Sequence, residues 1–249
     1  MKRFLIALIF FSVIFGFQAK ENETFRYVVT YKWGLIQKDA GEVLITKKPG
    51  GNGYELKMVA KTKPWADKIY KVRDTLISQT QKERYRPLKY SYIAHEKNKY
   101  RRDEVKFSYS GNLVKGVSEK FKEEKNGEIS HSVNEMEASG PVYDMLSVYF
   151  FLRELDYPNM KAGDIVKATI FSGSKPENLE VKSLGKEMVE LRDKKSQEAW
   201  HIQFKFTQKG GKKSSDDINC WISTDSAHIP LLIVGSLPIG QIRVNYEGS

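Results

Sequence analysis

The sequence predicts a mainly β protein, built as a large curved antiparallel sheet or half-open barrel with one central amphipathic helix. Apolar and polar side chains alternate along most of the chain with the two-residue period of half-buried strands. Short polar or glycine-containing turns separate these stretches, which favours antiparallel pairing of neighbouring strands. A single segment, residues 142–155, shows a clear helical period instead.

The first strands are predicted at residues 25–33, 42–46 and 54–61. In 25–33 apolar residues stand at every second position, and the cluster at 49–53 (PGGNG) is a turn signal. Residues 64–70 are expected to form one or two helical turns, because a proline is tolerated in the first turn of a helix.

Further strands are predicted before the central helix. Two turn signals, 110–112 (SGN) and 126–127 (NG), are typical of hairpins. The strands that surround them are expected at 72–79, 89–95, 100–109 and 113–121, with a weak edge strand that contains Ile129 and Val133.

The central helix is predicted over residues 142–155, after the helix-start signal at 139–141 (SGP). Its apolar stripe consists of Met145, Val148, Tyr149, Leu152 and Leu155. We expect an amphipathic helix in a β protein to cover one face of the sheet or to plug one of its ends.

After the helix the β pattern resumes. Strands are predicted at 165–171, 177–183, 187–192, 200–206, 218–223, 229–235 and 240–246, with a basic loop at 209–215 (KGGKKSS). We expect residues 20–249 to form a single β-rich domain, because neither half alone contains a helix that would close its core. The alternative is two β subdomains with a break near 135–141.

The N-terminus has the organisation of a secretory signal peptide, which we assign to residues 1–19. Lys2 and Arg3 precede an uncharged stretch at 4–17. This stretch is shorter than the roughly 20 residues of a spanning helix, so cleavage after Ala19 is favoured over an uncleaved membrane anchor. The only cysteine, Cys220, lies far from this site, so no lipoprotein is expected. The mature protein is expected in the periplasm or otherwise outside the cytoplasm, without a transmembrane segment.

The net charge limits the classes of binding partner to be expected, and the cysteine content excludes an internal disulfide. The chain carries 41 Lys and Arg against 31 Asp and Glu, a formal charge of +10, which becomes +8 without Lys2 and Arg3. Export weighs against nucleic acid and favours an anionic envelope lipid or glycan, or an envelope protein. The alternative is an ordinary solvated basic surface, because the cations are spread along the chain. Cys220 cannot form an internal disulfide and is expected to be a small buried core residue.

No catalytic motif is present in the sequence. The four histidines are not at metal-ligand spacing, so we expect no metal and no cofactor. The serine motif Gly-x-Ser-x-Gly is also absent. The adjacent carboxylates Asp103 and Glu104 would point to opposite faces of a strand, which argues against shared chemistry.

Two residues are candidates for ligand binding. Trp65 follows Pro64 in a loop or short helix, so it is better placed for an exposed contact than the other three tryptophans, for which core packing is expected. Arg153 stands near the end of the predicted helix, where a cation favours the helix dipole. The alternative role for Arg153 is anion binding inside a cleft.

Segments at the start, middle and end of the chain carry a family resemblance. They are 27–34 (YVVTYKWG) with 40–42 (AGE), 144–147 (DMLS) with 150–153 (FFLR), and 221–225 (WISTD) with 230–231 (PL) and 239–240 (IG). In this order they resemble a family of exported bacterial proteins, the domain of unknown function 3108 (DUF3108). The resemblance spans nearly all of the mature chain. It implies an exported β-rich fold, of the half-open barrel kind called YmcC-like, and it implies no activity or catalytic residue.

These observations favour an exported, non-catalytic envelope protein that binds a lipid, a glycan or a protein partner. The alternative is a hydrolase of cell-wall or surface glycan, which needs two carboxylates, or a carboxylate and a histidine, in one cleft. A third reading is a structural subunit, which would expose a broad apolar patch. The shape and lining of the cavities are expected to discriminate among these functions.

Overall fold

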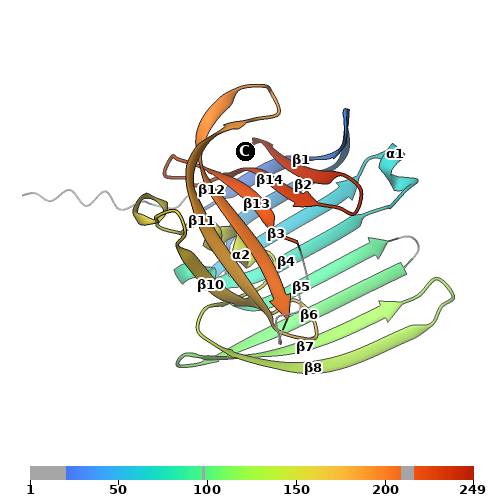
Figure 1. Cartoon of the computed structure of the whole chain (residues 1–249). Helices are drawn as coiled ribbons and strands as arrows, with labels where there is room; N and C mark the ends of the chain where they lie inside the picture. Colours follow the sequence, from blue (N-terminus) through green and yellow to red (C-terminus); the bar gives the residue numbers. More distant parts are fainter. Residues whose placement is uncertain (1–20, 97–98, 209–215) are drawn as a thin grey trace, which may run out of the picture.

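The computed structural model describes residues 21–96, 99–208 and 216–249 (Figure 1). The predicted signal peptide at 1–19 and the predicted basic loop at 209–215 lie outside the described residues. The helical segments of the described chain are α1 (Pro64–Asp67), α2 (Ser147–Arg153) and the 3-10 turns η1 (Glu83–Tyr85) and η2 (Tyr157–Asn159).

Fifteen strands make up the rest of the described architecture. The strands before α2 are β1 (Glu23–Trp33), β2 (Ile36–Gly50), β3 (Gly53–Thr62), β4 (Arg73–Gln81), β5 (Pro87–Glu96), β6 (Lys99–Ser110), β7 (Leu113–Glu123), β8 (Ile129–Ser139) and β9 (Val142–Tyr143). Those after α2 are β10 (Ile165–Ile170), β11 (Glu177–Glu190), β12 (Ser196–Gln208), β13 (Ile218–Ser223), β14 (Pro230–Ser236) and β15 (Gln241–Gly248).

All fifteen strands belong to one sheet, in the order β8-β7-β6-β5-β4-β3-β2-β1-β15-β14-β13-β12-β11-β10-β9. The first and last strands pair with each other in the middle of this order, with Tyr27 opposite Tyr246. Neighbours are antiparallel except for β9 and β10, which run parallel. This meander confirms the predicted mainly β, antiparallel fold.

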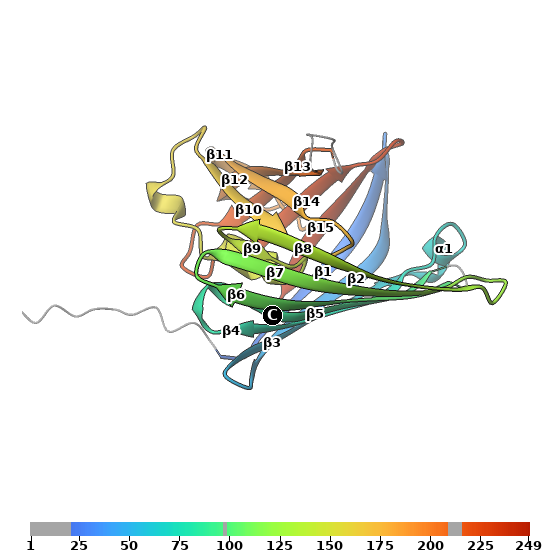
Figure 2. The ribbon, with the colours of Figure 1, turned by 90° about the horizontal axis from the view of Figure 1, so that it is seen from below.

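The two edges of the sheet approach each other, so the barrel is nearly closed (Figure 2). The chain passes from edge strand β8 to edge strand β9 through Gly140, whose φ of +94° suits glycine. The amide of Gly140 donates to Asn112 O, and Thr169 N donates to Pro141 O. Phe171, beyond β10, is fully buried against Gly116 of β7, where a Cβ atom would come within 2.6 Å of the ring.

Helix α2 lies between the two flanks of the sheet and belongs to both cores (Figure 1). Phe150 packs with residues of β1–β7, whereas Val148 and Leu152 pack with β10–β13. Because successive side chains of a helix point in different directions, one short helix fills the space on both sides. The helix therefore occupies the interior of the curved sheet.

The predicted helix at 142–155 is too long, and the structure corrects it to seven residues, Ser147–Arg153. Val142 and Tyr143 form strand β9 instead, because pairing with β10 satisfies their backbone groups. The carboxylate of Asp144 then accepts the N–H groups of Leu146 and Ser147, each at 2.7 Å. A buried carboxylate thus starts the helix where the apolar stripe alone predicts a continuous one.

The structure also bears on two expectations from the sequence, the burial of Cys220 and the presence of a membrane-spanning helix. Cys220 is buried on β13, and burial raises the pKa of its thiol well above the usual range. In the described parts of the chain, neither helix has the length and the apolar composition that a membrane span requires.

Candidate functional site

An apolar groove of about 720 Å³ lies at one end of the barrel, between α1 and the turn that joins β14 to β15. Figure 1 shows both of these segments on the same side of the molecule. Its lining residues are apolar, aromatic or glycine, except for Glu42, Lys61 and Thr62. A concave site of this size and composition fits an apolar ligand.

The sequence candidate Trp65 forms part of this groove. Its Nε1 donates to the carbonyl oxygen of Asp39 at 2.7 Å, so the polar edge of the indole is satisfied while the ring faces the groove. The ammonium of Lys38 lies 4.5 Å from the centre of the ring. Trp65 is therefore held in place before any ligand binds.

Helix α1 is too short to be stable alone, and polar contacts anchor it. The carboxylate of Asp67 forms an ion pair with Arg73 at 2.7 Å and accepts the hydroxyl of Thr62. The hydrogen bond from Arg73 has the largest effect on the pKa of Asp67, which it lowers, and the hydrogen bond from Thr62 lowers it further. The connection between β3 and β4 is thus folded back over the groove.

Exposed hydrophobic side chains gather at this end of the barrel, and four of them, Ile69, Tyr70, Leu237 and Ile239, line the groove. Three turns contribute seven of them, which we call the apolar rim: Trp33, Leu35, Ile36, Ile69, Tyr70, Leu237 and Ile239. The turn from β14 to β15 touches the end of β1, because Tyr31 donates its hydroxyl to Ile239 O at 3.1 Å and Gly240 lies against Trp33. The exposure of Trp33 corrects the expectation that it packs in the core, and Leu35, between β1 and β2, is fully exposed. Clustering of this kind marks an interaction surface.

The segment that carries α1 is also basic. Residues 61–73 contain five cationic side chains and a single carboxylate. Lys68 and Lys71, which flank Ile69 and Tyr70 of the apolar rim, are exposed and have no ion pair within the described structure. Cations beside an apolar surface favour an anionic amphiphile.

Arg153, the second sequence candidate, lies elsewhere. It lines a separate cavity of about 630 Å³, next to His228 and the end of α2, which shares no lining residue with the groove. The structure therefore does not bring Trp65 and Arg153 together. The short loop after β13 contributes Ala227, whose carbonyl oxygen accepts from Nε and Nη2 of Arg153 at 3.0 and 2.9 Å.

Glu23, Lys47 and Arg153 form what we call the buried charge cluster. Glu23 accepts from Arg153 at 2.9 Å and from Lys47 at 2.5 Å, and the Lys47 side chain is fully buried. Burial acts to raise the pKa of Glu23, but the hydrogen bonds and charges of the two cations hold it below its usual value. Most N–H donors of Arg153 bond to Glu23 or to the carbonyl oxygen of Ala227. Arg153 therefore links β1 to the end of α2.

The glycan hydrolase alternative requires acid–base groups that converge in a cleft. The Arg153 cavity does bring Glu23, Glu154 and His228 together, but Glu23 is paired with Lys47 and Arg153, and His228 Nδ1 lies 2.9 Å from Arg153 O. His201 lies 3.1 Å from Glu187, but neither of them lines this cavity or the apolar groove. Within residues 21–96, 99–208 and 216–249, no three His, Cys, Asp or Glu side chains gather as metal ligands would.

Comparisons with known proteins agree with the architecture. No curated protein sequence matches this chain. The crystal structure of a beta-barrel-like protein of the domain of unknown function DUF1849 from Brucella abortus is similar to it, with a TM-score of 0.55 and 11% sequence identity. The similarity covers 90% of this chain and 94% of that one, and at this identity it concerns the fold alone. The model of the family described as protein of unknown function DUF3108 matches residues 26–247, and the chain belongs to this family.

Proposed function

We propose that the protein is an exported, non-catalytic envelope protein that binds an anionic lipid, with an apolar chain in the groove and the headgroup beside the lysines. The observation that carries this proposal is a 720 Å³ apolar groove, lined in part by four of the seven exposed side chains of the apolar rim. Export follows from the predicted signal peptide at 1–19 and makes envelope phospholipids the available anionic amphiphiles.

The energetics favour entry of an acyl chain. Each methylene that leaves water contributes about 0.8 kcal/mol, and the groove offers that chain almost no polar surface. The rim side chains are exposed in the free protein, so they gain the same kind of stabilisation when they contact a membrane. The five cationic side chains of residues 61–73 add an electrostatic attraction to an anionic membrane surface. Salt weakens this attraction because it screens the charges.

The rim is tested with a double variant, Leu35→Ser with Ile239→Ser. Burial of one such side chain contributes about 1.5–3 kcal/mol, so we expect at least about tenfold weaker binding to vesicles that contain phosphatidylglycerol. The measurement is cosedimentation of residues 20–249 with vesicles of phosphatidylcholine alone or mixed with phosphatidylglycerol. The matched control is Ile165→Ser, an exposed isoleucine outside the rim, which should bind like the original chain. Equal binding of both variants would contradict a role of the rim.

The groove is tested separately with Ala60→Trp, which places a large ring among the groove walls. We expect this variant to lose saturable binding of a fluorescent fatty acid while the melting temperature and the vesicle binding through the rim persist. Ala162→Trp adds the same ring at an exposed position and serves as the control. Undiminished fatty-acid binding by Ala60→Trp would exclude the groove as the site.

A further inference from the structure

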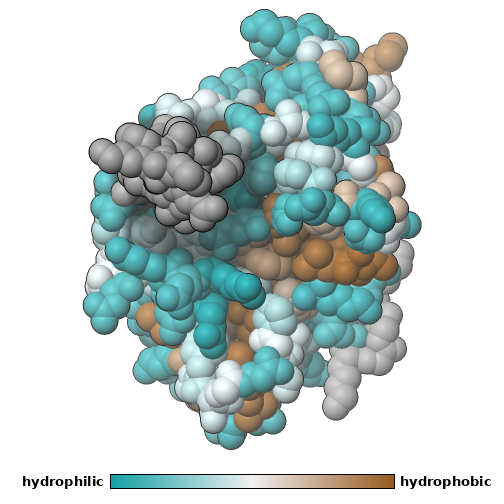
Figure 3. Space-filling view, turned by 90° about the vertical axis from the view of Figure 1, so that its left-hand side faces the viewer, coloured by the Kyte–Doolittle hydropathy of each residue, from teal (hydrophilic) through white to brown (hydrophobic). Residues whose placement is uncertain are grey.

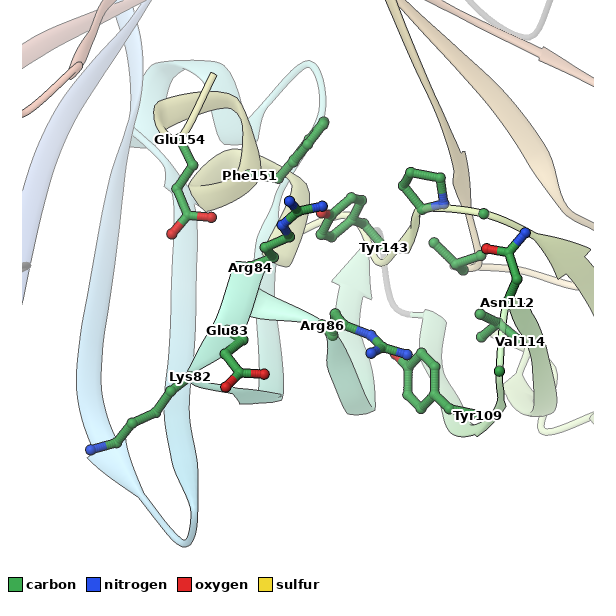
Figure 4. A pocket seen from close by; sticks show the side chains of 14 residues that line it. Lys82, Glu83, Arg84, Arg86, Tyr109, Asn112, Val114, Tyr143, Phe151 and Glu154 are labelled. Atoms are coloured by element: carbon green, nitrogen blue, oxygen red, sulfur yellow. The ribbon is translucent and has the colours of Figure 1, made fainter. Parts of the chain in front are cut away.

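We propose that a third cavity, at the end of the barrel opposite α1, binds the oxyanion of a ligand, a phosphate or carboxylate group, through Arg84 and Arg86. This cavity has a volume of about 740 Å³ (Figure 4). It lies between η1, the turn from β6 to β7, the crossing from β8 to β9, and the last turn of α2. Figure 3 shows the side of the molecule that carries this end, which is mostly hydrophilic with apolar patches of limited extent.

Arg86 is positioned before any ligand binds. Its guanidinium carbon lies 4.1 Å from the centre of the Tyr109 ring, and the Tyr109 hydroxyl donates to Pro87 O at 2.5 Å. Burial raises the pKa of Tyr109 to about 12, so the ring stays neutral. The Tyr109 hydroxyl also accepts a hydrogen bond from Arg86, so the guanidinium keeps only its remaining N–H groups available for a ligand.

Arg84 reaches the cavity because of an unusual backbone. Arg84 and Tyr85 both have positive φ, 53° and 49°, a conformation that side-chain-bearing residues seldom adopt twice in succession. The bend sends Tyr85 inward, where its hydroxyl accepts from the buried Lys47 at 3.2 Å. It leaves Arg84 in the cavity beside Tyr143 (Figure 4). Such outliers are found at ligand-binding sites more often than elsewhere.

Neither guanidinium forms an ion pair among the described residues, although the charge of Arg84 acts on the carboxyl of Glu154 in the same cavity, where it opposes the rise that burial causes in the pKa of Glu154. Among the described residues, the arginines with ion pairs are Arg73, Arg101, Arg153 and Arg192. The cavity lining holds three cations, with Lys82 as the third, against the two carboxylates Glu83 and Glu154. The buried charge cluster behind it adds two cations and one carboxylate, so an anion meets an excess of positive charge.

This site is independent of the proposed lipid groove. Strand β4 begins next to α1 and ends next to η1, so about nine residues of extended chain, roughly 30 Å, separate the two ends. The two cavities share no lining residue. Loss of binding at one of them therefore leaves the other measurable.

The test is an NMR titration that follows the Nε–Hε signals of the arginines in residues 20–249. The probes are inorganic phosphate, glycerol 3-phosphate and glucuronate, with glycerol as the neutral control. We expect saturable shifts of the Arg84 and Arg86 signals with at least one anion and none with glycerol. A response to both phosphates alone assigns a phosphate group, and a response to glucuronate alone assigns a carboxylate.

Variants connect the binding to the two arginines. We expect the double variant Arg84→Gln with Arg86→Gln to bind the anion at least about tenfold more weakly. The double variant Arg84→Lys with Arg86→Lys should have an affinity between that of the original chain and that of the glutamine variant, because lysine keeps the charge but not the forked set of donors. Arg102→Gln, which removes an exposed arginine outside the cavity, should match the original chain. The proposal is overturned if no anion shifts the two signals saturably, or if the double glutamine variant binds as tightly as Arg102→Gln. Vesicle binding should persist in every one of these variants.

Discussion

Replacement of Glu23 by alanine should lower the free energy of unfolding by about 3–5 kcal/mol, the usual cost of removing one partner from a buried ion pair. The carboxylate of Glu23 lies 2.5 Å from Lys47 Nζ and 2.9 Å from Arg153 Nη2. Lys47 is fully buried, so the variant would leave two cations inside the fold without a counter-ion. The measurement is urea unfolding of residues 20–249 followed by circular dichroism.

The matched control removes a cation instead. Lys47→Met leaves Glu23 and Arg153 as a neutral pair and places an apolar chain against the rings of Tyr54 and Tyr85. We expect a much smaller loss than for Glu23→Ala, because buried ion pairs can often be exchanged for apolar packing at little cost. The double variant should be more stable than Glu23→Ala alone. If Lys47→Met costs as much as Glu23→Ala, charge imbalance does not explain the role of Glu23.

Asp144→Ala is expected to destabilise the fold by about 3 kcal/mol, because it leaves several buried donors without an acceptor. The Asp144 side chain is fully buried. One oxygen accepts the N–H groups of Leu146 and Ser147, and the other accepts the hydroxyl of Ser78 at 2.6 Å. Ser78 lies on β4, so this carboxylate joins the start of α2 to the sheet. Asp144→Asn keeps the acceptor for the two amides and should lose far less.

The same residue should make stability depend on pH. Burial raises the pKa of Asp144 to about 6, although the hydrogen bonds from Ser78, Ser147 and Leu146 act against this. Between about pH 4 and pH 6 the native state therefore holds a proton that the unfolded chain releases, so stability falls as pH rises, by up to about 3 kcal/mol. The unfolding free energy of the original chain minus that of Asp144→Asn isolates this contribution. A difference that stays flat or grows with pH would contradict the raised pKa.

The strand pattern was predictable because alternation is a local property. The sequence 25–33 alternates apolar and polar residues, and strand β1 covers it, with Phe25 and Tyr27 buried. The turn at 49–53 joins β2 to β3, and Pro64 opens α1. A side-chain period and the turn residues are set by neighbours in the chain, so they can be read without the fold.

The limits of the central helix were not predictable from the same evidence. Its stripe of apolar residues is compatible with a helix over 142–155, but Val142 and Tyr143 find their backbone partners on β10, more than twenty residues away. Met145, predicted to lie on the apolar stripe, is exposed because it stands in the turn between β9 and α2. Pairing with a distant strand overrides the local periodicity here.

The sequence by itself determined the fold class and the positions of most strands and turns, since each depends on the order of side chains along a short segment, and it singled out Trp65 as a candidate for ligand contact. Only the tertiary structure decided that Trp65 shares a groove with Leu237 and Ile239, that Arg153 binds Glu23, and that Arg84 and Arg86 share a cavity with Tyr109. The physical reason is that these side chains meet across strands and turns far apart in the chain, and the curvature and register of a fifteen-stranded sheet set those distances.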